Sequence, residues 1–163
     1  MRKYLMILTM FGTLISCSGQ DYQSVVEKFD TYDFSPMEGF GMVTRSQDPF
    51  TGTKVIMVSR TEDNCGPYVI TYSIKDDRII SINSDLVIKG CGANNISEYR
   101  IVPLVENYLR VGVPVLSVYS SGNVLMNPFY IAPPIMARCL SKNCKNLEQK
   151  GFKQFVEHWA IKK

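Results

Sequence analysis

Cysteine is the residue type in this sequence with the widest range of available chemistry. The chain has five cysteines, at positions 17, 65, 91, 139 and 144. A thiol can carry a lipid, form a disulfide, bind zinc or take part in thiol exchange, and the spacing helps to separate these roles. No CxxC pair is present, which disfavours both a thiol-redox catalyst and a zinc site built from four of these cysteines. The odd count indicates that one cysteine differs in role from the other four.

The segment before Cys17 has the layout of an export signal. Arg2 and Lys3 are followed by a mostly apolar run over residues 4–15, a pattern typical of secretory signals. The run is shorter than the roughly 20 residues that a transmembrane helix needs. Residues 1–16 are therefore expected to be a targeting segment.

The end of this run, Leu14-Ile15-Ser16-Cys17, resembles the lipobox of bacterial lipoprotein precursors. In that motif an aliphatic residue stands three positions before a cysteine, and a small residue directly precedes the cysteine. The resemblance implies that residues 1–16 are a lipoprotein signal peptide, cut off before Cys17, and that the Cys17 thiol carries a diacylglyceryl group. The alternative is an ordinary secretory signal in which Cys17 has no role.

An exported protein can hold disulfides, and four cysteines then remain for them. They allow three pairings, and local spacing favours Cys65–Cys91 with Cys139–Cys144. A turn centred between Asp76 and Asp77 pairs positions whose numbers sum to 153, which would set Cys65 opposite Ile88, and an offset could bring Cys91 there. Cys139 and Cys144 enclose only four residues. Free thiols remain the alternative.

Other residues that could perform catalysis give no recognisable pattern. The single histidine, His158, is followed by Trp159, and this favours a structural or surface role. Ser120-Ser121-Gly122 resembles a turn without a visible base, and no GxSxG, HExxH, P-loop or GxGxxG motif is present. The carboxylates Asp30 with Asp33, Glu62 with Asp63 and Asp76 with Asp77 lie in segments with turn-forming residues. We predict no catalytic residue, cofactor or metal site.

The best candidate for a binding segment covers residues 32–50. It is rich in glycine and proline and carries the apolar side chains Phe34, Met37, Phe40 and Phe50. Large apolar side chains on a loop can form a protein-binding surface. Packing of these side chains over a sheet is the favoured alternative.

These residues must be positioned by an α+β domain. Helical spacing is present over residues 22–29, at 94–109 around Pro103, after Pro133-Pro134, and at the C-terminus through Phe152, Phe155, Val156 and Trp159. Residues 41–45, 53–60, 68–75, 78–83, 85–89, 113–119 and 123–129 are predicted as strands. We expect residues 21–163 to form a single domain in which helices pack on one face of an antiparallel β-sheet, joined to Cys17 by a short tether at 17–20.

Composition narrows the function without naming it. The chain is 45% hydrophobic with a mean hydropathy of −0.03, which excludes a disordered or multi-span membrane protein. Removal of residues 1–16 lowers the formal net charge from +3 to +1, so nothing indicates a nucleic-acid partner. We expect an envelope lipoprotein, lipid-anchored on the periplasmic side of a bacterial membrane or on the cell surface, that binds a protein without catalysis, in the manner of an immunity or inhibitor protein. The alternatives are an envelope enzyme with an unfamiliar site and a structural component of an envelope complex.

Overall fold

The computed structural model describes residues 21–63, 65–85, 98–142 and 144–162 of the 163-residue chain. The expected signal peptide at 1–16, the lipidation site Cys17 and the tether at 17–20 lie outside these residues. So do Cys91, most of the strand expected at 85–89 and the start of the helix expected at 94–109. These expectations remain predictions.

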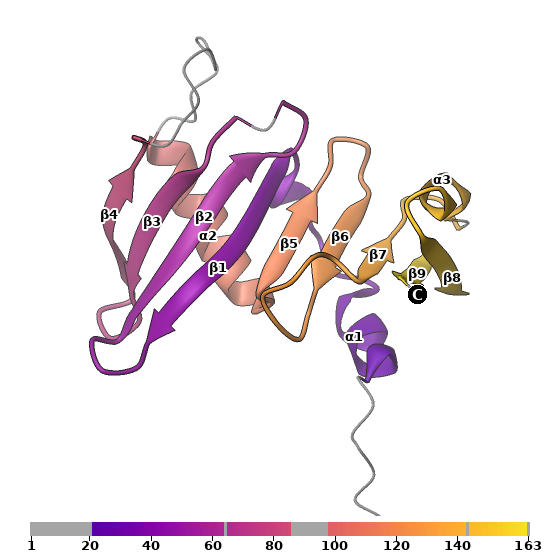
Figure 1. Ribbon diagram of the computed structural model, residues 1–163, viewed down its shortest axis with the longest axis horizontal. Helices are drawn as coiled ribbons and strands as arrows, with labels where there is room; N and C mark the ends of the chain where they lie inside the picture. The colour runs from indigo at the N-terminus through magenta and orange to yellow at the C-terminus, as the bar shows by residue number, and fades with distance from the viewer. Residues whose placement is uncertain (1–20, 64, 86–97, 143, 163) are drawn as a thin grey trace, which may run out of the picture.

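The described residues form one antiparallel sheet of nine strands (Figure 1). The strand order is β4-β3-β2-β1-β5-β6-β7-β9-β8. The strands are β1 (Phe40–Asp48), β2 (Thr53–Arg60), β3 (Tyr68–Ser73), β4 (Arg78–Asn83), β5 (Val115–Val118), β6 (Val124–Asn127), β7 (Met136–Arg138), β8 (Phe152–Val156) and β9 (Trp159–Lys162). The antiparallel sheet predicted from the alternating patterns is confirmed.

Several strands and one hairpin turn lie where the sequence predicts them. Strands β2 and β4 have the predicted bounds, and β1 is longer than the short strand expected at 41–45. The predicted hairpin around Ser120-Ser121-Gly122 is confirmed between β5 and β6, where the Gly122 amide donates to the Tyr119 carbonyl at 2.8 Å. Gly122 has a φ of 76°, a conformation that glycine adopts without steric cost.

The β3–β4 hairpin forms, but its register differs from the expected one. Ile70 pairs with Ile82 and Ser73 pairs with Arg78, so the expected register is wrong by one residue and then by two. The second offset comes from a bulge in β4, where Ile80 is the extra residue between the pairs Thr71–Ser81 and Tyr72–Ile79. Such a bulge adds one residue to a single strand and cannot be located from alternation alone.

The same hairpin contains a tyrosine, Tyr72, whose deprotonation at alkaline pH is expected to destabilise the domain. The Tyr72 hydroxyl donates to the Asp77 carboxylate; this bond, burial and the Asp77 charge raise the pKa of Tyr72 from 10.0 to about 12. Because the folded value is the higher one, its stabilising contribution is complete below about pH 10 and is lost as the pH rises through about 12. We expect the urea midpoint to fall across this window, and to fall less in Tyr72→Phe. Equal slopes for the two proteins would contradict this assignment.

The larger core cluster lies between one face of the sheet and three helical segments. These are α1 (Tyr22–Phe29), the 3-10 helix η1 (Ser35–Met37) and α2 (Glu98–Val111). The helices contribute the buried side chains Val25, Val26, Phe29, Met37, Ile101, Leu104, Val105 and Tyr108, and the strands contribute Met42, Ile56, Ile70, Leu116, Met126, Met136 and Trp159. The apolar stripes predicted for the first two helices are thus confirmed. Pro103 lies inside α2 and does not begin it.

A smaller cluster lies on the opposite face of the sheet, near its β8 edge. Leu125, Ala137 and Ala160 each neighbour, along their strands, a residue of the larger cluster, so they point to the other face. They pack with Leu147 of the short helix α3 (Lys145–Glu148) and with Phe152. The expectation that the helices pack on one face of the sheet is therefore not confirmed: α1 and α2 belong to one cluster and α3 to the other.

The C-terminal segment is a β-hairpin, and the helix predicted there is wrong. Phe152 lies in β8 and Trp159 in β9, on opposite sides of the turn that joins these strands. Their spacing also fits a helix, because a run this short satisfies both periods. Pairing of β9 with β7 decides the outcome. The short helix expected after Pro133-Pro134 is also wrong, since residues 131–133 form a bend and β7 follows.

Within the described part of the chain, no helix combines the length and the apolar character needed to cross a membrane.

Candidate functional site

A half-open cavity of about 560 Å³ lies at one end of the strands β1, β5 and β6. Its walls are the segment between α1 and β1, the β5–β6 turn, the end of β7 with the two residues after it, and His158. Val118 pairs with both Phe40 and Val124 at this end of the strands. The cavity, called the cleft below, therefore collects residues from four separated parts of the chain.

Arg138 is the fixed positive charge of the cleft. Its Nη1 donates to the Tyr32 carbonyl oxygen at 2.7 Å, and its guanidinium carbon lies 5.6 Å from the centre of the Phe34 ring. A guanidinium held over an aromatic face gains a cation–π attraction and loses rotational freedom. Arg138 is thus preorganised at the wall of the cleft.

Asp33 supplies a negative charge beside this arginine. Its Oδ1 accepts a hydrogen bond from the Ser35 amide at 2.9 Å. This bond, the Ser35 hydroxyl and the charge of Arg138 lower the pKa of the Asp33 carboxyl. Asp33 is therefore ionised at neutral pH, and the cleft presents fixed charges of both signs.

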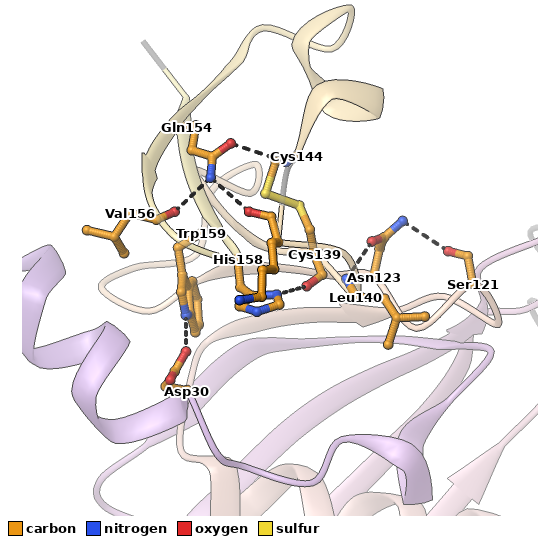
Figure 2. The surroundings of a disulfide bond; sticks show 11 residues. Asp30, Ser121, Asn123, Cys139, Leu140, Cys144, Gln154, Val156, His158 and Trp159 are labelled. Atoms are coloured by element: carbon orange, nitrogen blue, oxygen red, sulfur yellow. Dashed lines mark hydrogen bonds between the residues drawn. A yellow bond between two sulfur atoms is a disulfide. The ribbon is translucent and has the colours of Figure 1, made fainter.

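Asp30 connects the cleft to the larger core. Its Oδ1 accepts a hydrogen bond from the indole Nε1 of Trp159 at 2.9 Å (Figure 2). Trp159 is 0% exposed, and a buried indole N–H needs such an acceptor. The bond joins the end of α1 to β9 and fixes the carboxylate at the rim of the cleft.

His158 is held by backbone contacts. Its Nδ1 lies 3.2 Å from the Cys139 carbonyl oxygen, its backbone amide donates to Lys142, and its carbonyl accepts from the Cys139 amide (Figure 2). A carbonyl oxygen only accepts, so Nδ1 carries the proton in this bond. His158 also has a φ of 65° in the β8–β9 turn. The structural role favoured from the sequence agrees with this arrangement.

Cys139 lines the cleft and is joined to Cys144 by a disulfide (Figure 2). Both cysteines are buried in the smaller cluster, and their Cα atoms are 5.6 Å apart. Gln154 supports the enclosed loop, since its Nε2 donates to the Lys142 carbonyl at 2.9 Å. The predicted pairing of Cys139 with Cys144 is confirmed.

This disulfide is expected to stabilise the domain modestly, because the loop that it closes is short. Chain-entropy arguments give about 2 kcal/mol for a loop of this size. We expect the double variant Cys139→Ser, Cys144→Ser to lose about that much free energy of unfolding in urea. The single variant Asn146→Ala, at an exposed position two residues after the loop, is the control. A double variant as stable as the wild type would contradict the expectation.

Cys65 is also disulfide-bonded and is buried. Its partner lies outside the described residues, so the pairing with Cys91 stays a prediction. Among residues 21–63, 65–85, 98–142 and 144–162, no group of three or more His, Cys, Asp or Glu side chains could hold a metal ion.

In each of the three acidic pairs noted in the sequence, the two carboxylates have different partners. Asp30 and Asp33 accept from Trp159 and Ser35 as described above. Asp63 pairs with Arg60 at 3.2 Å, whereas Glu62 accepts from the Ser120 hydroxyl. In the third pair, Asp76 accepts from Ser73 at 2.9 Å and Asp77 accepts from Tyr72. These carboxylates therefore hold turns and caps in place.

The β5–β6 turn of the cleft is fixed from both sides. The bond from Ser120 to Glu62 ties it to the β2–β3 connection. Asn123 ties it to the residues after β7, because its Oδ1 accepts from the Leu140 amide at 3.2 Å (Figure 2). The turn is therefore held in place, with Ser121 exposed at its tip.

The apolar residues proposed from the sequence for binding have different positions. Phe34, Met37 and Phe40 are buried in the larger core cluster, which is the packing alternative favoured at the start. Phe34 also lines the cleft. Phe50 is 98% exposed at the β1–β2 turn, remote from the cleft along β1. The structure thus brings only Phe34 into the candidate site.

Sequence reasoning missed Arg138 altogether. It lies in a three-residue strand, in a region where a helix was expected, and its partner Tyr32 is 106 positions away. A lone arginine between apolar residues carries no local signal of such a contact. Only the pairing of β6 with β7 places it at the cleft.

Comparisons with protein families, with characterised proteins and with solved structures gave no match to this chain.

Proposed function

We propose that the chain is a lipid-anchored protein of the bacterial cell envelope that binds a partner protein through the cleft without catalysing a reaction. The observation that carries the binding role is the preorganised guanidinium of Arg138 beside the ionised Asp33. Charged groups fixed in a concave site favour a partner of complementary charge and suppress other partners. An immunity-like or inhibitor-like protein has this requirement.

The cleft also supplies the other features of a protein-binding site. Phe34 offers an aromatic wall, and Ser121 and Leu140 stand exposed at the rim. Binding energy concentrates where a few aromatic and arginine side chains are shielded from water by a rim of weaker contacts. Arg138, held over the buried Phe34 ring, is the expected centre of the interface.

The anchoring part of the proposal depends on the lipobox-like residues Leu14-Ile15-Ser16-Cys17. Two or more acyl chains hold a protein stably on a bilayer, since each buried methylene contributes about 0.8 kcal/mol. We expect the wild-type full chain to fractionate with membranes and Cys17→Ser to leave them. The control Ser18→Ala keeps the cysteine and should stay with the membrane. Retention of Cys17→Ser in the membrane fraction would overturn lipid anchoring.

The binding role is tested by photo-crosslinking in intact cells. A photoreactive amino acid in place of Ser121 is expected to give a crosslinked species of defined mass, because this position is exposed at the cleft. The same amino acid in place of Ser81, exposed on β4, is the position control. Crosslinking at position 121 no stronger than at position 81 would overturn binding at the cleft.

Charge reversal identifies the centre of the interface. Arg138→Glu is expected to abolish the crosslink from position 121, because it places a like charge beside Asp33 and removes the guanidinium. Arg100→Glu, at an exposed arginine of α2, is the matched control and should leave the crosslink unchanged. Loss of the crosslink in both variants, or in neither, would contradict the role given to Arg138.

A further inference from the structure

Exposed apolar side chains gather at the end of the sheet opposite the cleft. Phe50 is at the tip of the β1–β2 turn and is 98% exposed. Ile74 follows β3 and its amide donates to the Gly52 carbonyl, so it lies beside that turn. Tyr130 and Ile131, each 49% exposed, lie in the β6–β7 loop. Figure 1 shows the β1–β2 turn, the β3–β4 turn and the β6–β7 loop along one edge of the molecule. This edge is called the loop end below.

The described chain begins at the same loop end. Helix α1 starts at Tyr22, and the Tyr22 ring packs edge-on against Phe129 at a centroid distance of 5.6 Å. Phe129 directly precedes Tyr130 and Ile131. The packing of Val25, Val26 and Phe29 in the larger core fixes the direction of α1. The polypeptide therefore enters the domain next to the exposed side chains of the β6–β7 loop.

The distance from the lipid is limited by the length of the tether. Four residue spacings separate Cys17 from Asp21, and an extended chain covers at most about 14 Å over that length. A lipid on Cys17 would thus hold the start of α1, and with it the loop end, close to the bilayer.

From these observations we infer that the loop end is a membrane-docking surface, in which Phe50, Ile74, Tyr130 and Ile131 enter the interfacial region of the bilayer. The inference rests on the proposed lipid anchor at Cys17. Aromatic and aliphatic side chains are favoured at this depth, where the apolar part is buried and polar groups stay hydrated. The exposed basic side chains of Lys75 and Arg110 belong to elements of the same end and can meet lipid phosphates.

The opposite end then points away from the membrane. Residues Phe40, Val118 and Val124 mark the cleft end of their strands, whereas Asp48, Val115 and Asn127 mark the loop end. With the loop end on the bilayer, the cleft opens into the space beyond it. A partner protein could reach Arg138 without competing with lipid.

Tryptophan scanning with the lipidated full chain tests this orientation. The protein is reconstituted into vesicles of phosphatidylethanolamine and phosphatidylglycerol that contain brominated acyl chains. Phe50→Trp and Ile131→Trp place a reporter at the loop end, and Tyr99→Trp places one at the exposed start of α2, near the opposite end (Figure 1). The native Trp159 is buried in the core and gives the same background in every variant.

We expect the added emission at positions 50 and 131 to shift to shorter wavelength and to be lost by bromine quenching, with none of this at position 99. Co-flotation with the vesicles reports the lipid anchor separately. A protein that floats but shows no quenching at positions 50 and 131, or equal quenching at position 99, would overturn the docking surface and leave the anchor intact. A protein that does not float would overturn the anchor and the docking surface together.

Discussion

Replacing Trp159 with alanine is expected to lower the free energy of unfolding by about 3–5 kcal/mol, the range for removing a large buried aromatic side chain. Trp159 is the largest fully buried side chain in the described part of the chain and packs in the cluster shared by α1, α2 and the sheet. The change leaves a cavity and also leaves Asp30 without its indole donor. The measurement is a urea unfolding curve followed by circular dichroism.

Two further variants separate the contributions to this loss. Trp159→Phe keeps an aromatic ring and removes only the bond to Asp30 and part of the volume, so we expect a loss of roughly 1–2 kcal/mol. Phe155→Ala is the control, because Phe155 lies on the same hairpin but is 40% exposed. If Trp159→Ala were no less stable than Phe155→Ala, the placement of the indole in the core would be wrong.

The second large effect is expected in β5. Leu116→Ala should cost about 2–5 kcal/mol, as for other fully buried leucines. Leu116 lies opposite both Met42 of β1 and Met126 of β6, and all three are fully buried. Strand β5 joins the four strands on its β1 side to the four on its β6 side. A cavity at this position therefore weakens the contact between the two halves of the sheet.

The neighbouring residue provides a matched control. Ser117 points to the other face, where it lies opposite Gly41 and Leu125 and is partly exposed. Ser117→Ala should change the free energy of unfolding by no more than about 0.5 kcal/mol. Comparable losses in the two variants would contradict the assignment of faces in β5.

Local patterns predicted those parts of the fold that depend on adjacent residues. Strands β2 and β4 were predicted with their observed bounds, and the buried stripes of α1 and α2 agree with the helical spacing. Within such segments each side chain is directed by the backbone period, so a few neighbouring residues specify the element. The turn residues Ser120-Ser121-Gly122 likewise predict the β5–β6 hairpin from adjacent positions.

Long-range pairing decided the elements that the patterns did not. Residues 152–162 satisfy a helical spacing, but β7 offers β9 an edge with free backbone groups, and two strands form. Phe34, Met37 and Phe40 have the composition of an exposed binding segment, yet all three are buried in the larger core cluster, Phe40 as the first residue of β1. In each case the residues that decide the structure are far away along the chain, so no short window of sequence contains them.

The sequence by itself determined that the chain builds an antiparallel sheet with two amphipathic helices, because the periods of strand and helix are local. The sequence also contains the lipobox-like residues before Cys17, on which the proposed membrane location depends. Only the tertiary structure decided where a site can be. It brings Arg138 to Tyr32 and Trp159 to Asp30 across 106 and 129 positions, and contacts at such separations depend on the order in which strands pair.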